Sequence, residues 1–194
     1  MEDHDIILAS ASPRRESILS KTDLKFISIP SDIVEDFSIK LSPEAFCKHW
    51  AREKALNIAK DYPRSYILGA DTIVVLDNKI LGKPKDRDHS ISMLKSLSGK
   101  THEVLTGVSI IKIDSGVDVL FNTSTYVSIR TLKYSDICNY IDIYSPYDKA
   151  GSYGIQDRFS MYVKKIDGCF YNVMGLPISE FYKHFLEIRK KAYR

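Results

Sequence analysis

The sequence predicts an α/β fold with a central, mixed and twisted sheet flanked by helices, because strand and helix patterns alternate along it. Apolar, β-branched runs indicate strands at residues 6–10, 26–29, 66–76, 104–113 and 117–129. Ser115-Gly116 separates the last two runs and indicates a hairpin. Hairpin strands are antiparallel, so the sheet is expected to be mixed rather than all parallel.

The expected helices begin at residues suited to that position. Ser12-Pro13 and Ser42-Pro43 each place an N-cap residue before a proline at the first helical position. The helix after Ser42 is expected to run to about residue 62, and further helical patterns follow at residues 86–97, 135–143 and 179–193. The last helix is amphipathic, with basic residues near its C-terminal end.

Composition indicates one globular domain that spans residues 1–194. The chain is 44% hydrophobic and 27% charged, which is typical of a soluble protein. Its net charge is +3 without a long basic run, so no nucleic-acid partner is expected. No apolar segment is long enough for a membrane span, and the start does not read as a signal peptide. Three widely spaced cysteines indicate reduced thiols and a cytoplasmic protein.

The first strand-to-helix junction combines two hydroxyls, a proline and two adjacent arginines, in the stretch Ser10-Ala11-Ser12-Pro13-Arg14-Arg15. A helix N-terminus attracts anions, yet two arginines there oppose the helix dipole. That conflict is resolved if a phosphate lies among the guanidinium groups and accepts bidentate hydrogen bonds. A surface turn with two solvated arginines explains the segment equally well.

Asp71 interrupts an otherwise apolar run from residue 66 to residue 76. A carboxylate in such a segment is unfavourable unless it is paired, hydrogen-bonded or bound to a metal. It either caps a bulge through neighbouring N–H groups or serves as a catalytic acid at a strand junction, and the second interpretation is slightly favoured.

Four further side chains have both a functional and a structural interpretation. Lys54 shares a helical row with apolar residues, so it either extends along the helix to solvent or points into a cleft. Lys83 lies in a Gly-Lys-Pro turn that either is solvated or aims the lysine. Glu35 lies in an acidic loop that is solvated or supplies an oxygen ligand to a divalent cation. Gln156 ends a glycine-bearing loop, residues 148–156, which either is a plain turn cluster or presents the amide for reading a base. Together these residues form the set that a metal-dependent enzyme acting on a nucleoside triphosphate needs.

Six segments, in order, resemble the Maf family of nucleoside triphosphate pyrophosphatases: ASASPRR at 9–15, GADT at 69–72, GKP at 82–84, LSGKTHEVLTGV at 97–108, DKAGSYGIQ at 148–156 and NVMGLP at 172–177. Asp157 departs from the pattern, since a glycine often follows the glutamine. The resemblance implies a fold akin to inosine triphosphate pyrophosphatases, with two lobes and a deep cleft.

The resemblance also implies hydrolysis of a nucleoside triphosphate to the monophosphate and diphosphate with Mg²⁺ or Mn²⁺. The implied roles are a general base at Asp71, metal ligands at Glu35 and Asp71, triphosphate contacts at Ser10, Arg14, Arg15, Lys54 and Lys83, and base selection by Thr72 and Gln156. The Tyr-Gly-Ile-Gln ending resembles the branch that takes dTTP, UTP and modified pyrimidine nucleotides, and a homodimer is expected as common in the family. The alternative is a nucleotide-binding regulatory protein of cell division with little or no turnover.

Overall fold

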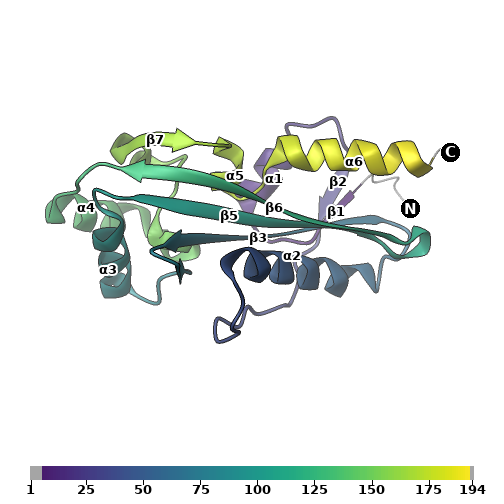
Figure 1. The fold of residues 1–194 in the computed structure, drawn as a ribbon, viewed down its shortest axis with the longest axis horizontal. Coiled ribbons are helices and arrows are strands. Elements are labelled where there is room, and N and C mark those ends of the chain that lie inside the picture. The colour runs from purple at the N-terminus through teal and green to yellow at the C-terminus, as the bar shows by residue number, and fades with distance from the viewer. Residues whose placement is uncertain (1–5, 193–194) are drawn as a thin grey trace. The chain divides into compact units, whose positions relative to one another are not determined.

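The computed structural model describes residues 6–192 and has the predicted α/β architecture (Figure 1). The strands are β1 (Ile6–Leu8), β2 (Phe26–Ser28), β3 (Tyr66–Leu76), β4 (Lys79–Leu81), β5 (Thr101–Lys112), β6 (Val117–Ile129) and β7 (Val163–Asp167). The helices are α1 (Pro13–Leu19), α2 (Pro43–Ala59), α3 (Arg87–Leu97), α4 (Tyr134–Tyr144), α5 (Phe170–Met174) and α6 (Ile178–Ala192). Four short 3₁₀ turns, among them η4 (Arg158–Tyr162), complete the described elements.

The strands form one mixed sheet in the order β2-β1-β3-β5-β6-β7, with β4 paired to β3. β1 runs parallel to β2 and β3, whereas β4 and β7 pair antiparallel with β3 and β6. The prediction of a mixed sheet flanked by helices is therefore confirmed. The chain divides into two compact units: the first has residues up to 71, residues 106–123 and residues from 175, and the second has residues 72–105 and 124–174.

In the first unit the sheet has α2 on one face and α6 on the other (Figure 1). The alternation of side chains along β3 produces this arrangement. Tyr66 packs edge-on against Phe185 of α6, with ring centroids 5.2 Å apart. The next residue, Ile67, lies in a buried cluster with Ala55 and Ile58 of α2.

Two glycines allow α2 to lie directly on the strands. A Cβ atom at Gly69 of β3 would lie 2.2 Å from the carbonyl oxygen of Ala51, and one at Gly107 of β5 would lie 2.3 Å from that of Cys47. Neither position tolerates a larger residue unless the helix moves. Burial raises the pKa of the Cys47 thiol to about 12. Cys47, which belongs to α2, is therefore a buried and protonated thiol.

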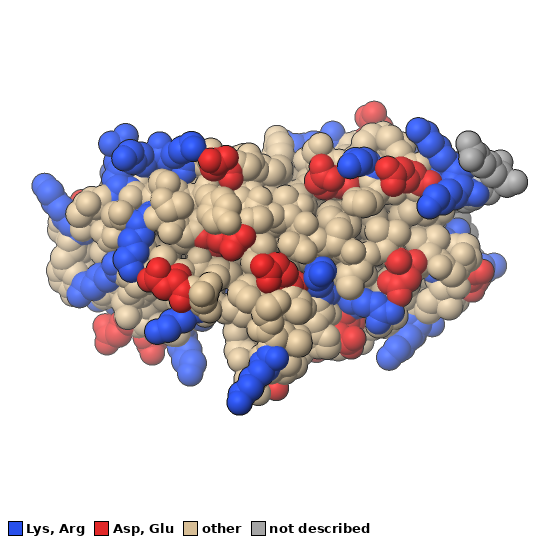
Figure 2. Space-filling model, viewed as in Figure 1, with Lys and Arg blue, Asp and Glu red and all other residues tan. Residues whose placement is uncertain are grey.

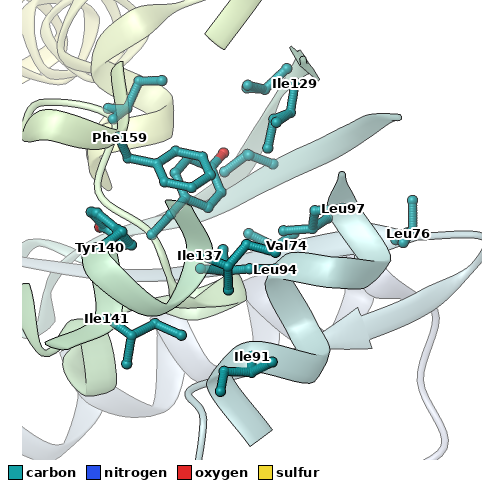
Figure 3. Close-up of a cluster of buried hydrophobic side chains, with 14 residues drawn as sticks. Val74, Leu76, Ile91, Leu94, Leu97, Ile129, Ile137, Tyr140, Ile141 and Phe159 are labelled. Atoms are coloured by element: carbon teal, nitrogen blue, oxygen red, sulfur yellow. The ribbon is translucent and has the colours of Figure 1, made fainter. Parts of the chain in front are cut away.

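The second unit has its own core between its strands, α3, α4 and η4. In Figure 3, Ile137 and Tyr140 of α4 and Phe159 of η4 lie in one cluster with the strand residue Val74. The rings of Tyr140 and Phe159 are 5.0 Å apart. This core supports the loop that precedes η4.

Besides the 3₁₀ turns, two strands and one helix were absent from the prediction. β4 follows a tight turn at Asp77-Asn78, whose φ angles of 50° and 62° are left-handed, and Asp and Asn tolerate that conformation better than most residues. β7 carries Lys164, Lys165 and Asp167 on a largely exposed strand at the end of the strand order, so it lacks a clear apolar pattern. The third element, α5, lies at Phe170–Met174, where no helix was predicted.

The ends of the predicted elements also shift. α2 ends at Ala59 rather than near residue 62, and β5 begins three residues before the predicted start at 104. Ser12 is the N-cap residue of α1, but its side chain makes no capping hydrogen bond, contrary to its expected role. The prediction for the last helix includes residue 193, which lies outside the described residues.

The surface visible in Figure 2 carries basic and acidic side chains interspersed among uncharged ones. Within residues 6–192, no helix has both the length and the apolar character needed to cross a membrane.

Candidate active site

Asp71 lies at the middle of β3 and is 5% exposed. Gly69, two residues earlier, allows α2 to approach the strand closely, as described above. This approach brings Lys54 of α2 to the carboxylate, and Lys54 Nζ donates a hydrogen bond to Asp71 Oδ1 at 2.7 Å. The carboxylate is therefore ion-paired and does not serve as the bulge cap of the alternative interpretation.

Lys54 also donates a short hydrogen bond to Glu35, which lies in the loop between β2 and α2. The Lys54 side chain is only 12% exposed, so it does not extend along the helix into solvent. Two carboxylates thus share one ammonium group. With all three groups ionised, the cluster carries one negative charge in excess.

The electrostatics of the cluster are dominated by burial. Desolvation raises the pKa of Asp71, and the nearby Glu35 carboxylate raises it further. Lys54 and Arg15 oppose this shift because their positive charges favour the carboxylate form. The raised pKa of Asp71 makes this carboxylate a stronger base than an exposed aspartate.

Ser10 and Arg15 form a second group in the same unit. The hydroxyl oxygen of Ser10 accepts hydrogen bonds from Ser12 N at 3.1 Å and from Arg15 Nη1 at 3.2 Å. Arg15 Nε donates to the carbonyl oxygen of Gly175 at 2.8 Å. Burial and the neighbouring Arg14 lower the pKa of Arg15, whereas Asp71 and Glu35 raise it. The guanidinium is thus within electrostatic reach of the carboxylate pair.

The remaining predicted site residues, Thr72, Lys83 and Gln156, belong to the second unit. Thr72 directly follows Asp71 and is half-buried, while Lys83 and Gln156 are exposed. The carbonyl of Gly82 accepts a hydrogen bond from Gly151 N at 3.1 Å. This bond joins the Gly-Lys-Pro turn to the loop that ends in Gln156.

Sequence reasoning missed two supporting residues. Gly175 supplies the carbonyl that holds Arg15, and its φ of 117° is a conformation that favours glycine. Asn172 of α5 is buried, and its Nδ2 donates to Val104 O and Thr125 Oγ1, both at 3.0 Å. The motif at residues 172–177 contains both residues, but it served only the family resemblance and gave neither of them a role at the site.

Comparisons with known proteins agree with the motifs. A family model described as Maf-like protein matches residues 5–188. A protein of Syntrophomonas wolfei named dTTP/UTP pyrophosphatase is 45% identical over 175 residues, which cover 90% of this chain and 93% of that protein. One of the same name from Carboxydothermus hydrogenoformans is 40% identical over 97% of this chain and 99% of that protein. A solved structure of a HAM1 protein from Coxiella burnetii aligns with a TM-score of 0.48 and 16% identity, covering 66% of this chain and 73% of that one.

Proposed function

The chain belongs to the Maf family, and on that premise we propose that it hydrolyses nucleoside triphosphates to the monophosphate and diphosphate, with dTTP and UTP preferred. The observation that carries the proposal is the cluster of Glu35, Lys54 and Asp71 in the first unit. Hydrophobic residues stabilise a core as well as or better than a buried ion pair does. A buried charged cluster therefore points to chemistry rather than to stability.

The carboxylates fit a divalent cation. Glu35 and Asp71 converge on one positive charge, and carboxylate oxygens are preferred ligands of Mg²⁺ and Mn²⁺. Within residues 6–192 no group of three or more His, Cys, Asp or Glu side chains is arranged to hold a metal. Mg²⁺ is commonly held by one or two carboxylates together with substrate phosphates, so Glu35 and Asp71 would hold it in this way. When bound, the cation acidifies a water and neutralises charge on the phosphates.

Asp71 is the general base in this proposal. A water oxygen forms a bond to the α-phosphorus, and the bond from that phosphorus to the bridging oxygen of the β-phosphate breaks, so that diphosphate leaves. The proton of the attacking water goes to the Asp71 carboxylate. Burial raises the pKa of Asp71, which makes the proton transfer more favourable.

The cations contact the triphosphate. Lys54 has three N–H donors and uses two on Glu35 and Asp71, which leaves one for a phosphate oxygen. Ser10 uses both acceptor positions on Ser12 and Arg15, so its own proton is available to donate. Arg14 and Lys83 supply further positive charge along the phosphates.

Thr72 and Gln156 select the base. The amide of Gln156 offers a donor and an acceptor, which complement the O4 and N3–H edge of thymine or uracil. Its exposure leaves the amide accessible to a nucleotide. A site with such contacts rejects other bases because its own polar groups are left unpaired.

The proposal is tested by phosphate release, with a coupling pyrophosphatase, over the common ribo- and deoxyribonucleoside triphosphates. We expect dTTP and UTP to be hydrolysed well ahead of the purine nucleotides. The alternative, a nucleotide-binding regulator of cell division, predicts binding of the same nucleotides without release of diphosphate. Calorimetric binding measured beside the release assay separates the two functions.

The proposal also includes Mg²⁺ or Mn²⁺ as the cation, the cytoplasm as the compartment and a homodimer as the assembly. Free thiols at Cys47, Cys138 and Cys169 support a reducing compartment. Sedimentation equilibrium checks the assembly, and the release assay repeated with each metal checks the cation.

A further inference from the structure

The ammonium group of Lys54 lies between two carboxylates. Lys54 Nζ donates to Asp71 Oδ1 at 2.7 Å and makes a short hydrogen bond to Glu35 Oε1. One carboxylate comes from the loop before α2 and the other from β3, so the lysine joins two separate parts of the first unit. The chain's own lysine thus serves as the counter-ion of the pair.

The position of this ammonium group also suits a divalent cation. Mg²⁺ lies about 2.0–2.1 Å from its oxygen ligands and is commonly held by one or two carboxylates. An ammonium nitrogen lies about 2.7–2.9 Å from a carboxylate oxygen to which it donates. Because Glu35 Oε1 and Asp71 Oδ1 already contact one nitrogen atom, a small adjustment of the two side chains lets them contact one metal ion instead.

The lysine and a divalent cation are unfavourable together at this pair. Three positive charges would then face two negative ones, and the two cations repel each other twice as strongly as two unit charges at the same distance. Burial strengthens this repulsion, because the side chains of Lys54 and Asp71 are only 12% and 7% exposed. The positive charge of Arg15 also acts on Asp71 and adds to the repulsion. Binding of a divalent cation therefore favours the departure of one basic side chain.

Lys54 is better able to leave than Arg15. The guanidinium of Arg15 is held by Ser10 Oγ at 3.2 Å and by the carbonyl oxygen of Gly175 at 2.8 Å. Lys54 instead carries its ammonium on a flexible chain of four carbons, and its hydrogen bonds go to the two carboxylates. Those hydrogen bonds are lost when a divalent cation takes the same oxygens, so the lysine is released.

We propose that Lys54 and a divalent cation exchange at Glu35 and Asp71, with the lysine holding the two carboxylates together until the cation replaces it. The inference rests on the proposed function, in which these carboxylates hold the cation. The exchange frees for phosphate oxygens the two N–H donors that Lys54 uses on the carboxylates. A nucleotide gives the released lysine an anion to contact, so nucleotide and cation should each raise the affinity for the other.

The first test follows Lys54 in the wild-type protein without nucleotide. Acetylation of each lysine by an activated ester is quantified by mass spectrometry across a titration with Mg²⁺. NaCl at equal ionic strength is the reference, because salt alone weakens an ion pair. The Lys54 side chain is 12% exposed while it is paired, so its release should accelerate its acetylation severalfold.

Lys48 is the internal control, because it is half-buried on the same helix and lies outside the cluster. Its acetylation should not respond to Mg²⁺. In Glu35→Gln the pair keeps one carboxylate, so the acetylation of Lys54 should be fast from the start and should depend little on Mg²⁺. A cation that binds beside the lysine without replacing it would leave the acetylation of wild-type Lys54 unchanged or slower, and that result would overturn the proposal.

The second test measures the affinity for Mn²⁺ alone, from the electron paramagnetic resonance signal of the free ion. A neighbouring opposite charge changes the proton affinity of a carboxylate by about one to three powers of ten, and it competes with a metal ion in the same way. Lys54→Met should therefore lower the dissociation constant for Mn²⁺ by at least about tenfold, whereas Lys48→Met should match the wild type. An unchanged constant in Lys54→Met would contradict the exchange.

Repulsion without exchange would also weaken Mn²⁺ binding in the wild type, so the acetylation of Lys54 decides between the two explanations. That measurement needs no variant, and it carries the test if Lys54→Met fails to fold.

The two proposals fail in different ways. A wild-type protein that releases diphosphate from no nucleotide overturns the proposed function and leaves the cation measurements unaffected. An active wild type in which the acetylation of Lys54 does not respond to the cation overturns the exchange alone.

Discussion

The two units differ in the kind of polar group that they bury. In the first unit, Lys54 and two carboxylates form a charged cluster against β3. In the second unit, hydroxyls, an imidazole and backbone groups hold the loop at residues 148–159, with the carboxylate of Asp157 at its margin. Charged groups suit a site that transfers a proton and binds a phosphate. Neutral hydrogen-bonding groups suit a site that holds a loop in one conformation.

The largest expected effect comes from replacing Asp71 in the charged cluster of the first unit. Asp71→Asn should lower the rate of hydrolysis by at least about 10²–10⁴, because the general base and one metal ligand are lost together. Nucleotide binding should persist, since the cations that contact the phosphates are intact. The measurement is single-turnover hydrolysis beside calorimetric binding, and near wild-type turnover would rule out Asp71 as the base.

Removing a cation should affect the two units differently. Lys54→Ala removes the ammonium group that pairs with the buried Asp71 and with Glu35, so the free energy of unfolding should fall by about 3–5 kcal/mol. Lys83→Ala removes an exposed side chain and should leave the melting temperature unchanged. Both variants should lower kcat/KM by roughly 10- to 100-fold through lost charge-assisted contacts.

Denaturant titration and steady-state kinetics on the same preparations check this contrast. Equal stability of the two variants would show that the ion pairs of Lys54 contribute nothing to folding. Unchanged kcat/KM in Lys54→Ala would assign the lysine a structural role only.

The neutral interior of the second unit should show itself in the pH dependence of stability. Burial lowers the pKa of His102 from an ordinary 6.5 to about 4, so the unfolded chain binds its proton first as the pH falls. The stability that His102 contributes is full above pH 6.5 and is lost toward pH 4, by about 3 kcal/mol in total.

Asp71 acts in the opposite direction, because its raised pKa lets the folded state take up a proton first. The effect of His102 is therefore isolated by comparing wild type with His102→Gln between pH 4 and 7. As the pH falls, the free energy of unfolding of the variant should decrease less than that of the wild type, because the contribution of His102 is missing. If the free energy of unfolding depends on pH in the same way in both proteins, the lowered pKa of His102 does not contribute to acid destabilisation.

The smallest expected effect concerns the base. Gln156→Glu replaces a donor and acceptor by an acceptor alone, so the preference for dTTP and UTP over dGTP should shrink by about tenfold. Stability should not change, because residue 156 is exposed. The check is kcat/KM across the common nucleotides, and an unchanged profile would remove Gln156 from base selection.

The sequence was informative where one residue conflicted with its surroundings. Asp71 in an apolar strand and Lys54 in an apolar helical row were both identifiable, and both lie in the charged cluster. The partner Glu35 was selected by family resemblance, because no local pattern distinguishes it from the other acids of its loop. Arg15 and Gly175 are 160 residues apart, and such a contact depends on the whole fold rather than on local preference.

The same reasoning explains the errors in the fold. β7 has little buried apolar surface of its own, so only its pairing with β6 defines it as a strand. The end of α2 falls before the predicted residue because helix ends vary with local turns. By contrast, β3 and β6 have long apolar or β-branched patterns and match their predicted ranges.

The contact of α2 with the sheet makes Cys47 a reporter of local opening. A thiol reagent reaches this side chain only while the helix is lifted from Gly69 and Gly107, so the labelling rate measures how often that happens. Cys138 and Cys169 are half-buried and belong to the second unit, so their faster reaction serves as an internal reference. Because α2 also carries Lys54, a nucleotide that engages this lysine should hold the helix down and slow the modification of Cys47.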